Sequence, residues 1–204
     1  MNSTAKEIRA RNLRTIGALS ALFLVPLVVS FVLYYATDWR PAGSTSHGDL
    51  ILPPRPLPNL SSDLVRPTGG AKGPAIANLF ADKWSLVYIG TGECATACRR
   101  ALLVMRQTRL SLNNEMTRVQ RVFLANSPCC DDEFLSREHV GLMVIDANAP
   151  PFQALLSRFP PDNREYSLFI VDPLGNLMMR YDARQNPKGL LDDLKKLLKL
   201  SHIG

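Results

Sequence analysis

Two cysteines four residues apart, Cys94 and Cys98, stand where an apolar run gives way to a helical pattern. In a helical turn, residues at positions i and i+4 share one face, and their Cα atoms lie close enough for a disulfide. A helix N-terminus favours negative charge, so it lowers the pKa of a nearby thiol. The pair is therefore suited to cycle between dithiol and disulfide, or to hold a soft metal such as Cu(I). A purely structural disulfide is the alternative interpretation.

A second pair of cysteines, Cys129 and Cys130, is adjacent in the sequence. Either thiol could pair with Cys94 or Cys98, or resolve a mixed disulfide formed there. Alternatively, both are inert thiols near the same edge of the sheet. All four cysteines together would give a Cys₄ zinc site, but the adjacent pair breaks the usual ligand spacing of zinc knuckles. Cys129 and Cys130 are therefore secondary candidates for the active site.

The hydrophobic pattern predicts the elements that position these cysteines. Residues 84–89 form a β-rich apolar run typical of a buried strand, and residues 99–112 show the apolar stripe of a helix. Later patterns predict strands at 119–124, 168–171 and 177–181, a short apolar run at 142–145, and helices at 132–138, 151–159 and 188–200. A βαβ start, a hairpin and a closing helix predict an α/β fold with a mixed sheet flanked by helices. With thiols at the end of the first core strand, the fold is expected to be thioredoxin-like.

The N-terminal region predicts a membrane anchor. Residues 15–36 carry no charged side chain and are long enough to span a bilayer as one helix. Residues 1–14 form a basic tail, which should stay in the cytoplasm by the positive-inside rule. The sequence therefore predicts an uncleaved single-pass anchor in a bacterial inner membrane, with the C-terminal domain in the periplasm. All four cysteines would then lie in a compartment that permits disulfides.

Residues 37–74 are rich in proline and glycine, which excludes long helices and central strands. We expect them to form a linker, with the short apolar patch at 49–52 docking on the domain edge. Residues 75–204 are then the thioredoxin-like domain. The net charge of +6 includes no basic stripe with interleaved aromatic residues, so nucleic-acid binding is not indicated.

Three further polar features are expected to be unremarkable. His47 lies in the predicted linker and should be solvated, whereas a metal ligand is its less favoured role. His139 should be a surface histidine. The charges between Asp192 and Lys199 alternate along a helix, which is typical of a solvated face.

Together these features resemble the Sco/SenC family of membrane-anchored, thioredoxin-like proteins, which help to build the dinuclear copper site of cytochrome c oxidase. The resemblance rests on the single anchor, the proline-rich stalk, the Gly-x-Gly-x-Cys-x-x-x-Cys motif that ends at Cys98, and the Asp-Pro-x-Gly turn at Asp172. It implies that Cys94 and Cys98 are the copper and redox pair. Pro128 and Asp131 match the family's Asp-Pro-x-x-Asp motif, whereas Ser127 does not.

One departure from the family concerns its third copper ligand. That ligand is a histidine about eight residues before the first residue of the hairpin turn, where this chain has Arg164. No histidine occurs between residues 140 and 201. The complete copper site of the family is therefore not carried over, although two thiolates alone suit Cu(I).

The sequence favours a membrane-anchored, exported assembly factor for cytochrome c oxidase. Cys94 and Cys98 would exchange between dithiol and disulfide and would handle Cu(I), the one metal that the resemblance implies. A respiratory oxidase subunit, or its assembly factors, would be the partner. Two alternatives stay open: a non-catalytic scaffold with a structural disulfide, and a general periplasmic thiol–disulfide oxidoreductase.

Overall fold

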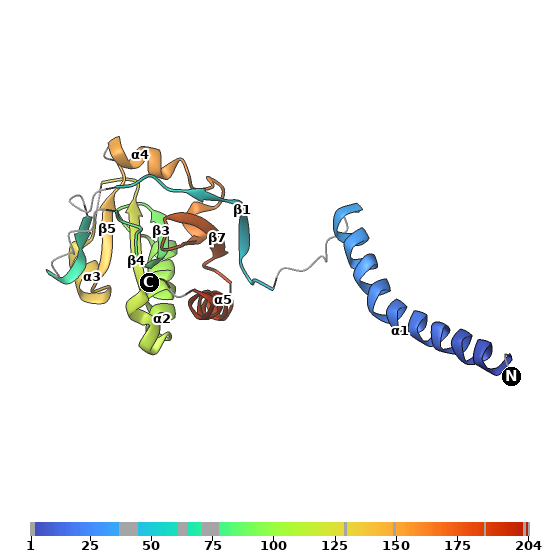
Figure 1. Cartoon of the computed structure of the whole chain (residues 1–204). Helices are drawn as coiled ribbons and strands as arrows, with labels where there is room; N and C mark the ends of the chain where they lie inside the picture. Colours follow the sequence, from blue (N-terminus) through green and yellow to red (C-terminus); the bar gives the residue numbers. More distant parts are fainter. Residues whose placement is uncertain are drawn as a thin grey trace. The chain divides into compact units, whose positions relative to one another are not determined.

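The computed structural model describes residues 3–36, 45–60, 65–70, 78–128, 130–148, 150–185, 187–201 and 203. The chain divides into two compact units, residues 1–44 and 45–204. The first unit contains the helix α1, Ser3–Ala36 (Figure 1). Within the described residues, its segment Glu7–Ala36 is the one stretch long and apolar enough to cross a membrane. The helix begins earlier than the apolar segment predicted at 15–36 because the basic tail continues it.

The second unit is built on a seven-stranded mixed sheet with the order β1-β7-β6-β3-β4-β5-β2. Strands β3, β4 and β5 are parallel to one another, whereas β6, β7 and the edge strands β1 and β2 pair antiparallel. The strand bounds are Asp49–Pro56 for β1, Val65–Pro67 for β2, Trp84–Gly90 for β3, Val119–Ala125 for β4, Leu142–Asp146 for β5, Ser167–Val171 for β6 and Asn176–Asp182 for β7. The predicted mixed α/β sheet is confirmed.

Helices cover both faces of this sheet (Figure 1). They are α2, Thr96–Leu110; α3, Asp132–Glu138; α4, Pro150–Leu156; and α5, Pro187–Leu200. Because side chains alternate along a strand, β3 sends Leu86 and Tyr88 into one core with α2, α3 and α5. Val87 and Ile89 enter the opposite core, which α4 covers. The sheet is therefore buried on both sides, which accounts for the nearly continuous apolar sequence of β3, in which Ser85 is the polar exception.

Both edge strands come from the segment that the sequence predicts to be a linker. The compact unit begins at Thr45 rather than at residue 75, because β1 pairs with β7 and β2 pairs with β5. The prolines of β1 are tolerated since an edge strand leaves one row of backbone groups unpaired, and its register shifts between Leu50 and Arg55. The expected docking of residues 49–52 on the domain edge takes the form of this strand.

The other charged residues between Asp192 and Lys199 are exposed as expected, but Asp193 on α5 is buried and corrects the expectation at that one position. It is 4% exposed and accepts hydrogen bonds from the Tyr181 hydroxyl at 2.6 Å and from the backbone N–H groups of His47 at 2.6 Å and Gly48 at 3.2 Å. Burial acts to raise the pKa of Asp193, but these hydrogen bonds outweigh it and hold the pKa below its ordinary value. The carboxylate thus fixes the start of the unit, and His47, although half exposed, has its ring nitrogen Nδ1 3.0 Å from Asp193.

Candidate functional site

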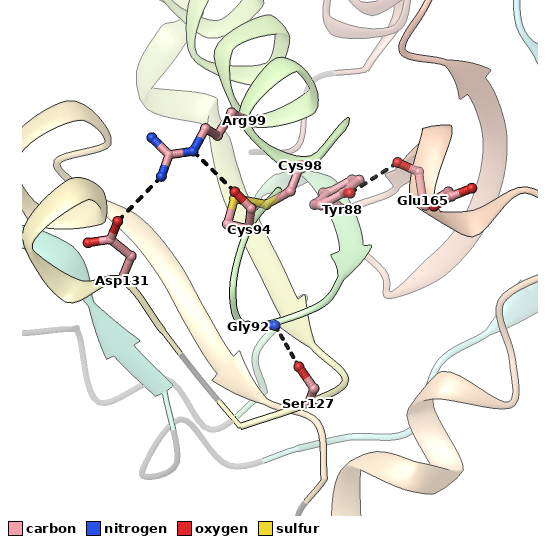
Figure 2. Close-up of a disulfide and its surroundings, with 8 residues drawn as sticks. All are labelled: Tyr88, Gly92, Cys94, Cys98, Arg99, Ser127, Asp131 and Glu165. Atoms are coloured by element: carbon pink, nitrogen blue, oxygen red, sulfur yellow. Dashed lines mark hydrogen bonds and ion pairs between the residues drawn. A yellow bond between two sulfur atoms is a disulfide. The ribbon is translucent and has the colours of Figure 1, made fainter. Parts of the chain in front are cut away.

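Cys94 lies in a tight turn between the end of β3 and the start of α2. The Cys94 N–H donates to the Thr91 carbonyl at 3.1 Å, and the Gly92 N–H donates to the Ser127 hydroxyl at 2.8 Å (Figure 2). Cys94 has a φ of +47°, a left-handed conformation that non-glycine residues rarely adopt. This turn thus places Cys94 beside the first turn of α2.

Gly90, the last residue of β3, is required by close packing at this turn. A Cβ atom at position 90 would lie 2.7 Å from the Tyr88 ring and 2.8 Å from its hydroxyl oxygen. The Tyr88 hydroxyl donates to the Glu165 carbonyl at 3.0 Å, and the ring is buried. Burial, followed by the charges of Glu165 and Tyr166, raises the pKa of Tyr88 far above its ordinary value. Tyr88 therefore stays protonated and acts as a fixed wall of the turn.

Cys94 and Cys98 are joined by a disulfide, with their Cα atoms 4.9 Å apart (Figure 2). Cys98 lies in the first turn of α2, which begins at Thr96 and has no acidic residue in that turn. The spacing of four residues brings the two sulfurs together as the sequence predicts. Their exposed fractions are 0% for Cys94 and 3% for Cys98, so the bond is covered by the surrounding core. Whether the pair is functional stays a prediction.

Arg99 connects the cysteine turn to α3. Its Nε donates to the Cys94 carbonyl at 3.2 Å, and its terminal nitrogen lies 3.4 Å from the Asp131 carboxylate (Figure 2). The guanidinium also lies 4.2 Å above the centre of the Phe134 ring. Asp131 in turn caps α3 by accepting the Phe134 N–H at 3.0 Å. The position of Arg99 directly after Cys98 already indicates positive charge beside the cysteine pair, whereas its contacts with Cys94 and Asp131 are visible only in the fold.

Arg164, where the resemblance to Sco proteins leads us to expect a histidine, serves the packing of α4. It begins the short 3₁₀ helix η4, Arg164–Tyr166. Its guanidinium donates to the carbonyls of Leu156 at 2.8 Å, Phe159 at 2.6 Å and Pro160 at 2.8 Å. These bonds satisfy carbonyl groups at and just beyond the C-terminal end of α4. In the part of the chain that the structure describes, no cluster of three or more His, Cys, Asp or Glu residues could hold a metal ion.

Of the two secondary candidates, Cys129 and Cys130, the structure describes only Cys130. Cys129 lies outside the described residues. Cys130 is half-buried and packs against the core cluster that contains Cys94 and Cys98. Cys130 is itself disulfide-bonded, but not to Cys94 or Cys98, which are bonded to each other. A resolving role for Cys130 stays a prediction, and it requires that its own disulfide first be reduced.

His139 corrects the expectation of a surface histidine. Its side chain is 3% exposed and packs edge-on against Phe134, with the ring centres 5.1 Å apart. Its Nδ1 is buried and has no hydrogen-bond partner among the residues that the structure describes. Burial, then the charges of Arg121 and Arg106, lowers the pKa of His139 to about 4. The short polar stretch around it gave no sign of this, because the burial comes from the neighbouring helix α2 and strand β4.

We expect His139 to make the folded chain less stable as the pH falls. The unfolded chain binds a proton on this residue near pH 6.5, whereas the folded chain does so only near pH 4. The contribution of neutral His139 to the free energy of unfolding is therefore fully present above about pH 6.5. It decreases as the pH falls toward 4, by on the order of 3 kcal/mol. Urea unfolding of the detergent-solubilised chain between these pH values measures the loss. The variant His139→Phe should flatten this pH dependence, and a wild-type slope in that variant would refute the assignment.

The chain is similar to a known protein family. The family described as "transmembrane-like, thioredoxin-like, C-terminal domain" matches residues 84–201, which hold the cysteine turn, the hairpin and α5. No curated protein matches the chain.

Solved structures share the fold. Apo Sco1 from Thermus thermophilus has 20% identity and a TM-score of 0.53, covering 76% of this chain and 99% of that chain. Copper-bound yeast Sco1 has 16% identity and a TM-score of 0.52, covering 77% and 95%. BsSco, described with a disulfide switch and as a member of the Sco family of cytochrome c oxidase assembly proteins, has 12% identity and a TM-score of 0.52, covering 78% and 98%. The expected likeness to Sco proteins is thus confirmed at the level of fold. The transmembrane-like, thioredoxin-like C-terminal domain family matches residues 84–201, which is more than half of the chain. The chain therefore belongs to that family.

Proposed function

We propose that the protein is a membrane-anchored, exported assembly factor for cytochrome c oxidase that works by thiol–disulfide exchange at Cys94 and Cys98. The observation that carries this proposal is the disulfide itself, which lies between a buried strand and the first turn of α2. That location suits thiolate chemistry, since a helix N-terminus stabilises negative charge. BsSco, which is named as a cytochrome c oxidase assembly protein, has a similar fold, and this supports oxidase assembly as the process in which the exchange takes place.

The exchange would proceed in two successive steps. A thiolate of the partner attacks one sulfur of the Cys94–Cys98 disulfide, which forms a mixed disulfide and releases the other sulfur as a thiolate. A second partner thiolate then attacks the mixed disulfide. The partner leaves with a disulfide, and Cys94 and Cys98 hold the two electrons as a dithiol. The reverse reaction uses the same steps, with Cys94 or Cys98 as the attacking thiolate.

The chain's own residues would support each step. Cys98, in the first turn of α2, is expected to be the thiol with the lower pKa, because the N–H groups of that turn stabilise its thiolate. Arg99 adds positive charge nearby and holds the Cys94 carbonyl. Tyr88 keeps the far wall of the turn fixed through Glu165. In this scheme Arg99 and Tyr88 are positioning residues.

Cu(I) would be the cargo of the reduced pair. Two thiolates on one turn offer soft ligands, which Cu(I) prefers. Arg164 already donates to three carbonyl groups, so it supports a two-cysteine site rather than the three-ligand site of the Sco family. Copper would then bind to Cys94 and Cys98 alone, or with a soft ligand supplied by the receiving protein.

A non-catalytic scaffold is the second candidate, and burial favours it. Because Cys94 is 0% exposed, an external thiolate reaches its sulfur only if the turn opens. In the scaffold, the disulfide would only hold the turn against α2. A general periplasmic oxidoreductase would need the same opening but would act on many partners.

The anchor would place this chemistry outside the cytoplasm. We assign residues 1–14 to a cytoplasmic tail, 15–36 to a single span of the bacterial inner membrane, and the unit from residue 45 onward to the periplasm. The basic residues Arg9, Arg11 and Arg14 beside the apolar segment support this orientation.

Oxidase assembly in cells tests the proposal. Cells that depend on this chain would carry the wild type, Cys94→Ser, Cys98→Ser or the control Ala101→Ser, which adds a hydroxyl to the same buried cluster. Cytochrome c oxidase activity in membranes is expected to fall to background for both cysteine variants and to persist for the control. Normal activity with Cys94→Ser, at equal protein level, would establish the scaffold. Loss of other exported disulfide proteins as well would identify the general oxidoreductase.

A further inference from the structure

A groove of about 300 Å³ lies between α2 and α3, next to the cysteine turn. It is lined by residues of α2, of α3 and of the position just after α3: Arg99, Leu103, Arg106, Phe134, Arg137, Glu138 and His139. Neither Leu103 nor Arg106 has a part in the exchange chemistry. The groove is therefore a surface whose role the proposed function leaves open.

One face of α2 presents alternating cationic and apolar side chains that line this groove and continue beyond it to Leu110. Arg99, Leu103, Arg106 and Leu110 follow a spacing of four, three and four residues, which places them in one stripe of the helix. Leu103 is 44% exposed and Leu110 is 53% exposed, so two large apolar side chains remain in water. A stripe of this kind matches a partner that carries both carboxylates and apolar side chains.

The charge of the groove is positive on the α2 side. Helix α2 contains four arginines and no acidic residue. Carboxylates of α3 and its cap face them, with Arg106 3.5 Å from Glu138 and Arg99 3.4 Å from Asp131. Such exposed ion pairs contribute only about 0.2–1 kcal/mol. A guanidinium has five N–H donors, so these arginines keep donors available for further carboxylates.

A buried arginine that interacts electrostatically with the groove residues Arg106 and His139 adds to this positive field. Arg121 on β4 is 4% exposed, and its Nε and one terminal nitrogen have no hydrogen-bond partner among the described residues. Its other terminal nitrogen donates to the Val140 carbonyl at 2.7 Å. Burial, then the charges of Arg109 and Arg106, lowers the pKa of Arg121 to about 10, so it remains charged at neutral pH. No carboxylate in the described part of the chain forms an ion pair with it.

Arg99 connects the groove to the disulfide. The same side chain that lines the groove donates to the Cys94 carbonyl and lies between that residue and Asp131 (Figure 2). A segment bound along α2 would therefore end beside Cys94 and Cys98.

We propose that the groove between α2 and α3 docks an acidic segment with apolar side chains, contributed by the protein whose cysteines exchange with Cys94 and Cys98. This inference rests on the proposed function for its partner, but not for its binding chemistry. The carboxylates of the segment pair with Arg99 and Arg106, and its apolar side chains cover Leu103. Docking then raises the local concentration of partner thiols at the disulfide.

The test measures binding and exchange separately, with the full chain in uncharged detergent. Two synthetic peptides have the same central segment, and one carries a Glu/Leu extension whereas the other carries a Lys/Leu extension. Each peptide is made in two forms, with either two serines or two cysteines in the central segment. Fluorescence anisotropy of the serine peptides reports docking without any redox step. The acidic peptide is expected to bind about tenfold more tightly than the basic one, and added salt should reduce this difference.

Variants locate the binding. Arg106→Glu should weaken the acidic peptide about tenfold, and Leu103→Ser should weaken both peptides. The control Lys195→Glu makes the same charge change at an exposed site on α5 and should have no effect. Equal binding of both peptides, or equal loss in the control, would overturn the docking inference. Thiol–disulfide exchange with the cysteine peptides is measured separately. Selective docking without exchange would support the docking inference and refute the proposed function. Exchange without selective docking would support the proposed function and refute the docking inference.

Discussion

A chain with both Cys94 and Cys98 replaced by serine is expected to lose all tight Cu(I) binding. The reduced wild-type chain should bind Cu(I) one to one, because the disulfide shows that the two sulfurs can approach each other on one turn. Serine hydroxyls are hard ligands that Cu(I) does not prefer, so the double variant removes the site without altering the size of the side chains greatly. Anaerobic titration of the reduced chain against a competing Cu(I) chelator measures the difference.

The control Ala101→Ser should titrate like the wild type, since it adds a hydroxyl to the same core cluster but leaves both thiols in place. Binding that survives in the double variant would show that the copper ligands lie elsewhere, with Cys130 and the methionines as the next residues to replace. A wild-type chain that binds no Cu(I) would reject the copper part of the proposal and leave exchange alone.

Replacing Arg164 by histidine is expected to destabilise the chain rather than to restore a three-ligand copper site. The guanidinium donates to the carbonyls of Leu156, Phe159 and Pro160, and an imidazole cannot make three such bonds. Hydrogen bonds from charged groups are worth more than neutral ones, so the loss should be roughly 3 kcal/mol. Urea unfolding of the detergent-solubilised variant measures it, and Cu(I) titration should show no gain in affinity.

Arg158→His is the matched control, because Arg158 is exposed and nearby on the same stretch of chain. It should change the free energy of unfolding by less than about 0.5 kcal/mol. An Arg164→His chain that is as stable as this control and binds Cu(I) more tightly than the wild type would show that residue 164 belongs to the copper site after all.

The sequence was sufficient for the core of the fold because the relevant signals are local. Strand β3 is apolar except for Ser85, the hairpin has Gly175 at the positive φ of its turn, and α5 has a clear apolar stripe. The same holds for Cys94 and Cys98, whose approach requires only the geometry of one turn. Whether they exchange is a chemical question that spacing alone does not decide.

Features that depend on distant partners were missed. Asp193 and His47 are 146 residues apart, and nothing in either local sequence indicates that they meet. Their contact is also why the compact unit begins at Thr45, within a segment whose prolines suggested a linker. Arg164 is similar: the sequence shows an arginine where the resemblance to Sco proteins predicts a histidine, but only the fold shows that its side chain donates to carbonyl groups around the end of α4.

The reduction potential of the Cys94–Cys98 pair tests the central claim most directly. The full chain would be equilibrated anaerobically with glutathione or dithiothreitol buffers of graded potential, and the reduced fraction of this pair read by alkylation and mass spectrometry. An exchanging pair is expected to titrate between about −120 and −270 mV, the range of disulfides that react with partners. A pair that stays oxidised below about −300 mV would be a structural disulfide, and the protein would then be a scaffold of this fold rather than an exchange factor.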